Sequence, residues 1–188
     1  MKILRATDYK TMPWKNGMGS TTEIAIHPVD AKLDDFDWRV SMAQVASDGP
    51  FSSFAAIDRT LLVLEGNGID LSVAGQPITR ITRDTICSFP GDQPTSATLV
   101  DGPIVDLNVM SRRKTVMHDV RRIKLTQRQD FIVSTQTILI VEQGQLEVTT
   151  PAPRTVLDER DAILVDSSTP MLALDAGEAT HVIVIKLR

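Results

Sequence analysis

The side chains with the greatest capacity for chemistry gather near the N-terminus, in residues 12–23. Trp14, Lys15 and Asn16 precede two glycines there, and Glu23 follows them. Glycine allows a ligand to approach the backbone closely, and an indole ring offers a flat apolar wall. This composition fits a binding loop, and it fits equally a surface loop anchored by its tryptophan. The Gly-x-Gly spacing is no dinucleotide fingerprint, because no strand, loop and helix unit surrounds it.

A second group lies in the alternating segment 36–42, which predicts a half-buried strand. Because side chains alternate across a strand, Arg39 and Ser41 share one of its faces. A guanidinium on that face could hold a carboxylate through two hydrogen bonds. The same arginine could instead form a structural salt bridge with Glu23 or Asp58, and the sequence leaves both interpretations open.

A third group consists of Asp106, Asn108 and Met110, which share one face of the apolar run 104–110. A buried asparagine must find hydrogen-bond partners. A ligand could provide them, and so could a neighbouring backbone.

The histidines are too few and too scattered for a metal centre. His27, His118 and His181 are the only three in the sequence, and no His-x-His pair occurs. A divalent first-row metal would need several imidazole and carboxylate ligands together, so we expect neither a metal site nor a cofactor. The shortage of histidine also removes the commonest general base, and these patterns predict no catalytic residue. Cys87 lies in an apolar run and is expected to be a buried, inert thiol.

Composition limits the class of protein. With 188 residues and a formal net charge of -4, the chain is of an ordinary globular type, and its charge gives no support to nucleic-acid binding. A single cysteine excludes an intramolecular disulfide and fits a reducing compartment. No apolar stretch approaches the ~18 residues of a membrane helix, and no signal-peptide pattern opens the chain. We therefore expect a cytoplasmic protein with no membrane or nucleic-acid partner.

The elements that must position these side chains are mostly strands. Short apolar runs are separated by turns rich in Gly, Pro, Asp and Asn, and no long helical stripe occurs. A short helix is predicted only around residues 6–10. Many short strands at regular spacing indicate a sandwich or a barrel.

An internal repeat divides the chain into two related halves. Residues 59–66 read Arg-Thr-Leu-Leu-Val-Leu-Glu-Gly, and residues 136–144 read Gln-Thr-Ile-Leu-Ile-Val-Glu-Gln-Gly. Each copy continues with a strand, an Arg-Asp step and a closing strand. The repeat predicts an all-β, double-stranded β-helix (bicupin) fold, with two packed cupin-like barrels in one chain.

The domain boundary is expected after residue 113. Residues 1–113 would form the N-terminal barrel, with an N-terminal extension, residues 1–58, and a pocket. Residues 114–188 would form a smaller C-terminal barrel. The basic stretch in residues 112–124 is interpreted as a solvated connector between the halves.

Taken together, the motifs closely resemble those of the HutD/Ves family. The matching segments are, in order, Trp14-Lys15-Asn16-Gly17-x-Gly19-x-Thr21-Thr22-Glu23, Phe36-x-Trp38-Arg39-x-Ser41-x-Ala43, Gly49-Pro50-Phe51-Ser52-x-Phe54, Ile57-Asp58-Arg59 and Asp106-Leu107-Asn108-Val109-Met110. Their order and spacing agree over nearly the whole chain, although the second half carries little of the signature. One departure is Ala56, where the family pattern usually has Gly, so the bend of that loop is left unspecified.

The resemblance implies a bicupin fold and an association with bacterial histidine utilisation. It also implies a metal-free protein that regulates this pathway by binding a small carboxylate intermediate such as formylglutamate. The residues that it places in or around the pocket are Trp14, Lys15, Asn16, Glu23, Arg39, Ser41, Asp58 and Asn108.

Two other functions stay open at this level. A metal-independent enzyme, such as a hydrolase or isomerase acting on a similar acid, could use Glu23 or Asp58 as its acid–base group and Lys15 as an electrophile. An interaction scaffold with a vestigial pocket is the other alternative. Two-barrel cupins often pair through strand edges, so a homodimer is also expected.

Overall fold

The computed structural model describes residues 1–150 and 154–188, and its regular structure is almost entirely strand. The chain divides into two compact units. The N-terminal unit is Lys10–Met117, and the C-terminal unit combines Met1–Tyr9 with His118–Arg188. A short 3-10 turn, η1 (Ala6–Asp8), is the helical element of the described residues and lies where the sequence predicts one. The all-β class is confirmed.

The N-terminal unit is built from two sheets. One has the strand order β2-β3-β4-β11-β6-β9, and the other has the order β5-β10-β7-β8. The strands are β2 (Lys10–Pro13), β3 (Gly19–His27), β4 (Trp38–Val45), β5 (Gly49–Pro50), β6 (Ile57–Glu65), β7 (Ile69–Val73), β8 (Thr79–Ile81), β9 (Ile86–Pro90), β10 (Thr95–Leu99) and β11 (Ile104–Arg112).

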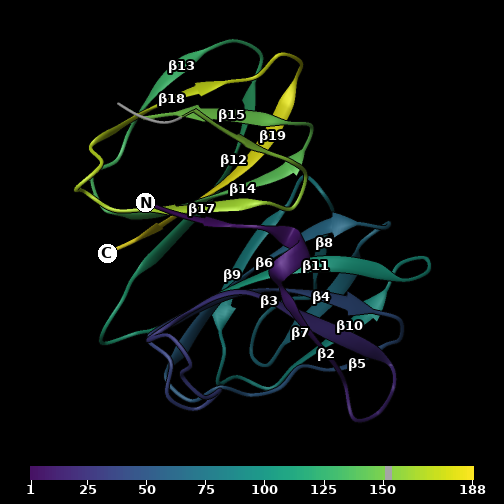
Figure 1. Cartoon of the computed structure of the whole chain (residues 1–188). Helices are drawn as coiled ribbons and strands as arrows, with labels where there is room; N and C mark the ends of the chain where they lie inside the picture. The colour runs from purple at the N-terminus through teal and green to yellow at the C-terminus, as the bar shows by residue number, and fades with distance from the viewer. Residues whose placement is uncertain (151–153) are drawn as a thin grey trace. The chain divides into compact units, whose positions relative to one another are not determined.

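The C-terminal unit also has two sheets, with the orders β1-β17-β14-β19-β12 and β13-β18-β15-β16. In Figure 1 the strands β13, β15 and β18 form one layer of this unit, and β12, β14, β17 and β19 form the other. The strands are β1 (Lys2–Leu4), β12 (His118–Leu125), β13 (Gln129–Ile132), β14 (Gln136–Gln143), β15 (Leu146–Thr149), β16 (Thr155–Leu157), β17 (Ala162–Val165), β18 (Met171–Asp175) and β19 (Thr180–Leu187).

The two units share one topology. The orders β4-β11-β6-β9 and β5-β10-β7-β8 recur as β12-β19-β14-β17 and β13-β18-β15-β16. The turn glycines of the repeat, Gly66 and Gly144, both have φ of 89°, in the left-handed region that glycine tolerates without steric cost. The register also shifts at the same place, just before each glycine turn. The internal repeat is therefore a repeat of structure.

The repeat is longer than the sequence motif indicates. Strands β4 and β5 have counterparts in β12 and β13, so the segment peculiar to the N-terminal unit is residues 10–37 and not the expected extension, residues 1–58. Residues 1–9 belong to the C-terminal unit because β1 pairs with β17. The division falls after Met117, four residues beyond the expected boundary.

The basic stretch near this division is not a solvated connector. Arg121, Arg122 and Lys124 lie on β12, and Nε of Arg122 donates to both carboxylate oxygens of buried Glu142 at 3.0 Å. Arg112 and Arg113 also make specific bonds, which are described below. Basic composition alone could not distinguish a strand from a linker.

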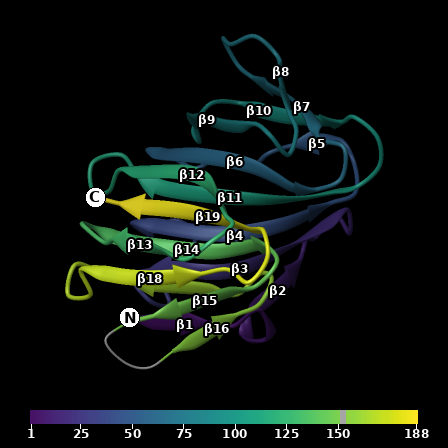
Figure 2. The same cartoon turned by 90° about the horizontal axis from the view of Figure 1, so that it is seen from above.

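The core of each unit lies between its two sheets. Leu61 and Val63 on β6 pack with residues of β7 and β10 in the N-terminal unit, and Leu139 and Val141 on β14 hold the same places in the C-terminal unit. Burying such a side chain contributes about 1.5–3 kcal/mol. Figure 2 shows β7 and β10 as a layer apart from β6 and β11. Within the described residues, the fold has no helix of the length and apolarity needed to cross a membrane.

Candidate binding site

A cavity of about 690 Å³ opens into the N-terminal unit. Two central strands contribute their inward-facing side chains to it, and these are Arg39, Ser41, Ala43 and Val45 of β4 with Asp106, Asn108 and Met110 of β11. Most of the remaining lining comes from the β2–β3 hairpin, residues 47–52 and Phe54. The two alternating faces predicted from sequence are thus the faces that line the cavity.

The polar bottom of this cavity is shared by three neighbouring strands. We call the buried polar residues that line it the floor, and they are Arg39, Ser41, Arg59, Asp106 and Asn108. On β11, Met110 pairs with Arg39 of β4 on one side and with Arg59 of β6 on the other. Directly paired residues on a sheet lie about 4.5–5.5 Å apart at Cβ. The register therefore places the two arginines on either side of Met110, at one end of the floor.

Arg39 combines the two roles that the sequence left open. It is 4% exposed, and its Nε donates to Oε2 of Glu23 at 2.8 Å. This is its one hydrogen bond to the described part of the chain, so its two terminal nitrogens are not committed to those residues. A guanidinium held by Nε presents its terminal nitrogens as a fixed fork that matches a carboxylate.

Arg59 is held by aromatic rings and by an amide. Its guanidinium carbon lies 4.8 Å, 5.9 Å and 5.3 Å from the ring centres of Phe51, Phe54 and Phe89, a cation–π arrangement. Its Nη2 donates to Oδ1 of Asn108. The pKa of Arg59 is lowered to about 10, chiefly by burial and in smaller part by the nearby Arg39, while the charge of Asp106 opposes the fall. Arg59 therefore remains a cation at neutral pH.

Asp106 is the most deeply buried carboxylate of the floor, at 0% exposure. Nδ2 of Asn108 donates to its Oδ1, and its Oδ2 has no hydrogen-bond partner among the described residues. Desolvation raises the pKa of Asp106 to about 7, against the opposing effects of Arg59 and of the Asn108 hydrogen bond. Asn108 therefore links an acid and a base that form no direct ion pair.

The β2–β3 hairpin places the aromatic wall of the cavity. The indole Nε1 of Trp14 donates to Oγ1 of Thr21 at 2.8 Å, and the ring packs on Gly19. A Cβ at Gly19 would lie 2.8 Å from the indole, so glycine is what permits this contact. Lys15 and Asn16 follow at the exposed rim.

Six of the eight residues expected around the pocket line the cavity, namely Trp14, Lys15, Asn16, Arg39, Ser41 and Asn108. Glu23 does not line it but holds Arg39 from behind, with its side chain 24% exposed. Asp58 is also outside the lining: its side chain is 50% exposed and accepts a hydrogen bond from Nε of Arg113 at 2.6 Å. Arg113 also donates to both carboxylate oxygens of Asp92, so Asp58 belongs to an ion-pair cluster outside the cavity.

Arg59 and Asp106 are functional candidates that the sequence expectation missed or left without a role. Arg59 is the neighbour of Asp58, and alternation places only one of the two on the inner face with Leu61 and Val63. All four residues from Leu61 to Leu64 are buried, so hydrophobicity does not reveal which face is inner. Arg59 itself could have indicated which face of β6 is the inner one. Both faces of this strand are buried, so an arginine on it cannot extend into solvent.

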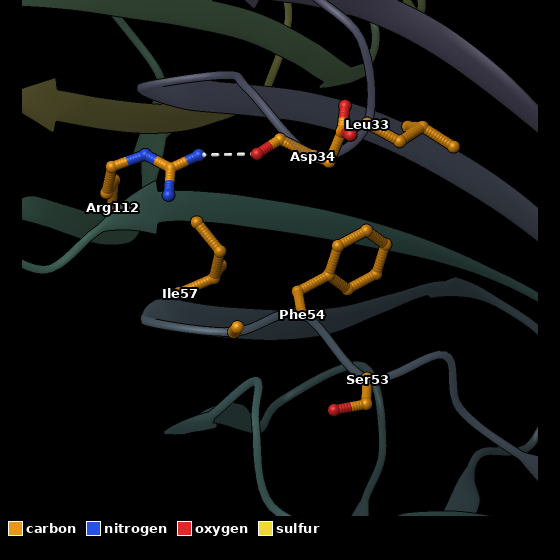
Figure 3. A pocket seen from close by; sticks show the side chains of 7 residues that line it. Leu33, Asp34, Ser53, Phe54, Ile57 and Arg112 are labelled. Carbon is orange, nitrogen blue, oxygen red and sulfur yellow. Dashed lines mark hydrogen bonds between the residues drawn. The ribbon is translucent and has the colours of Figure 1, made fainter.

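A second cavity, of about 390 Å³, shares Leu33 and Phe54 with the first. Figure 3 shows the Arg112 guanidinium pointing at the segment that carries Leu33 and Asp34. Its Nη2 donates to the carbonyl of Asp34 and its Nε to the carbonyl of Phe36, both at 3.1 Å. Arg112 therefore anchors the loop between β3 and β4 beside the site.

Donor groups for a metal are not clustered in the part of the chain that the structure describes. In residues 1–150 and 154–188 no group of three or more His, Cys, Asp or Glu side chains is arranged to hold an ion. Cys87 is half-buried, and burial raises the pKa of its thiol. The chemistry of the floor is that of two guanidinium groups, one carboxyl, an amide and a hydroxyl.

The paired sheets of each unit and the repeat of their topology define a protein of the cupin type. A cupin barrel protein from Leptotrichia buccalis superposes with a TM-score of 0.65 at 9% identity, covering 100% of this chain and 96% of that one, which concerns the fold alone. The chain belongs to the HutD family, whose model matches residues 6–184.

Relatives from bacteria agree with this assignment. An uncharacterised 21.2 kDa protein of the hutC 3' region of Pseudomonas putida is 41% identical over 110 residues, and protein Ves of Citrobacter koseri is 36% identical over 118. These matches cover 58% and 61% of this chain but only 57% and 61% of the relatives' own length.

Two solved structures match over nearly their full length. A conserved protein of unknown function from Pseudomonas aeruginosa PAO1 has a TM-score of 0.91 at 33% identity, covering 99% of this chain and 97% of that one. HutD from Pseudomonas fluorescens SBW25, in a formate condition, has a TM-score of 0.79 at 31% identity, with coverage of 100% and 98%.

Proposed function

We propose that this protein binds a small carboxylate metabolite in the N-terminal cavity and thereby regulates histidine utilisation, with formylglutamate as the foremost ligand. The observation that carries the proposal is the Arg39 fork at the cavity floor. Glu23 fixes this guanidinium through Nε, and its terminal nitrogens are not committed to the described chain. Such a pre-organised fork is suited to a planar carboxylate.

The other lining residues suit a ligand with an acid and a second polar group. Ser41 lies beside Arg39 on the same face of β4, within reach of the same ligand. Trp14 provides an apolar wall, and Lys15 at the rim can neutralise a second carboxylate. Asn108 is already bonded to Arg59 and Asp106, so its main part would be to hold those two charges in place.

The pathway is suggested by the names of the relatives. One is described by its position in a hutC 3' region, and a structural neighbour is called HutD. Formylglutamate, with two carboxylates and a formamide, fits the distribution of cations and polar groups around the cavity.

The cavity also bears on the alternatives. A vestigial pocket would be filled by core side chains, whereas this one has a volume of about 690 Å³. The two carboxylates considered as acid–base groups of an enzyme, Glu23 and Asp58, do not line it and are bonded to arginines. Both observations favour a binder.

Thermal unfolding with a panel of small acids tests the proposal. The purified protein is heated with histidine, urocanate, formiminoglutamate, formylglutamate or glutamate. A ligand at 100 times its Kd stabilises by about 2.7 kcal/mol, which corresponds to roughly 5–10 °C in Tm for a chain of this size. Formylglutamate should produce the largest shift. If no member of the panel raises Tm at millimolar concentration, this ligand class is wrong.

A pair of arginine variants assigns the shift to the floor. Arg39→Lys keeps the charge but loses the fork, so the ligand-induced shift should fall to less than half. Arg80→Lys is the matched control, because Arg80 makes a similar two-bond pair with Asp70 outside the cavity. An equal shift in both variants would exclude carboxylate recognition by Arg39. Conversion of formylglutamate detected by NMR, and lost in Glu23→Gln, would replace the binder by the enzyme alternative.

A further inference from the structure

The floor of the cavity holds a carboxylate that no described residue neutralises through a direct ion pair. Asp106 is fully buried, and no residue that the structure describes forms an ion pair with it. Its Oδ1 receives a hydrogen bond from Asn108, while its Oδ2 is unpartnered among those residues. A buried charge in this situation is strongly destabilised unless it takes up a proton or gains a partner.

The charged groups that share the cavity with Asp106 come from several elements. Paired directly with it are two neutral residues, Ala43 of β4 and Val63 of β6. The charged side chains that line the cavity, or are bonded to one that does, are Arg39, Arg59, Lys15, Asp48, Asp106 itself and Glu23. When Asp106 is ionised, the positive and negative charges of this set balance. When it is protonated, one positive charge is left over for an anion.

We propose that the cavity takes up one proton together with its anionic ligand, and that the carboxylate of Asp106 accepts this proton. A ligand carboxylate bound at the arginines adds a negative charge near Asp106 inside a poorly solvated site. Keeping two carboxylates ionised in one poorly solvated site has a high electrostatic free energy, so the buried one accepts a proton from solvent. Asp106 would thus set the charge of the ligand that the cavity accepts. The proposal rests on the proposed function, since it concerns the ligand of the same cavity.

The direction of the pH dependence follows from the ligand-free state. Desolvation places the pKa of Asp106 at about 7 before any ligand binds. A nearby anion can only raise it further, so the complex holds more protons than the free protein above neutral pH. By linkage, affinity should be highest and nearly constant below about pH 6, and should fall as pH rises through 7.

Calorimetric titration with N-formyl-L-glutamate measures this directly. Binding is followed at pH 6.0, 7.5 and 8.5 in buffers with different ionisation enthalpies, whose comparison gives the number of protons taken up. We expect little uptake at pH 6.0 and most of one proton at pH 7.5. The Kd should rise by up to about tenfold per pH unit above pH 7.

Two variants separate Asp106 from general charge effects. Asp106→Asn keeps an oxygen for the Asn108 hydrogen bond but cannot titrate, so uptake should vanish and Kd should be independent of pH. Asp58→Asn removes the same formal charge one residue from Arg59 but outside the cavity lining. It should retain the proton uptake of the unchanged protein.

The outcomes are distinct. Binding without proton uptake at pH 7.5, or the same uptake in Asp106→Asn, overturns the proton linkage and leaves the proposed function standing. No binding heat at any pH in either protein contradicts the proposed function itself. A carbon-13 NMR titration of the ligand-free protein adds an independent test, because an Asp106 carboxyl that is ionised below pH 5 would also overturn the linkage.

Discussion

Asn108 allows two opposite charges to share a buried floor without neutralising each other. Its carbonyl oxygen accepts from Arg59, and its amide nitrogen donates to Asp106. An amide offers an acceptor and a donor while carrying no charge of its own. Each charged group is therefore partly satisfied, yet neither is consumed by a direct ion pair. The positive charge of Arg59 therefore remains able to attract a bound anion.

At the same scale, Ala56 shows why the family pattern usually has glycine at its position. Ala56 adopts φ of 59°, in the left-handed region, which costs an L-residue other than glycine about 1–2 kcal/mol. Ala56→Gly should therefore raise the free energy of unfolding by about 0.5–1 kcal/mol, because part of the gain is lost to the greater freedom of glycine in the unfolded chain. Urea denaturation measures the difference.

Ala55→Gly is the control for this substitution, since Ala55 is not among the residues with positive φ. It should be neutral or destabilising. If Ala56→Gly proves less stable than the original protein, the left-handed backbone is not a source of strain.

At the scale of elements, alternation accounts for what could be predicted. On β4, one polar pair, Arg39 and Ser41, marks the inner face, and on β11 Asp106 and Asn108 do the same. Each strand therefore identifies its own cavity side. On β6 both faces are buried, so periodicity is lost and could not correct the choice of Asp58 instead of Arg59, which came from the family resemblance.

Contacts between distant segments could not be predicted in this way. Strands β4 and β5 match β12 and β13 in pairing order, but their sequences show no common motif, so the repeat was expected to be shorter. The loop between β3 and β4 is held by Arg112, which lies 76 and 78 residues away from its two partners. Because the acceptors are backbone carbonyls, no residue type in the accepting loop reveals these hydrogen bonds in the sequence.

The β2–β3 hairpin offers a test at this scale. A Cβ at Gly19 would lie 2.3 Å from the carbonyl oxygen of Gln44 and 2.8 Å from Trp14. Gly19→Ala should therefore destabilise by about 1–3 kcal/mol, displace the indole and weaken ligand binding. Urea denaturation and tryptophan fluorescence measure the first two effects.

Gly49→Ala is the matched control, because a Cβ there meets no heavy atom within 4 Å and its φ is not positive. Its free energy of unfolding should stay within about 0.5 kcal/mol of the original. A Gly19→Ala variant as stable as this control would show that the contact between the indole and residue 19 is dispensable.

At the scale of the whole molecule, the two units share one topology but differ in how polar their interiors are. Strand pairing around the shared register shift makes Thr137, Val182 and Val184 the counterparts of Arg59, Asp106 and Asn108. Val182 and Val184 belong to the apolar core of the C-terminal unit. The C-terminal unit therefore forms the same topology without a polar floor, so the topology itself does not require these buried charges.

Replacing the floor by apolar residues tests this inference. Exchanging buried ionic groups for apolar residues of similar volume is often neutral or stabilising by about 1–4 kcal/mol. The triple variant Arg59→Met, Asp106→Val and Asn108→Val should accordingly unfold with at least the original free energy and show no ligand-induced rise in Tm. The reverse change, Val182→Asp, places a carboxylate in the equivalent position without Asn108 or Arg59 and should destabilise by several kcal/mol. A triple variant that is clearly less stable would mean that the buried charges contribute to the stability of the N-terminal unit. The difference between the two interiors would then give no support to a binding role for the floor.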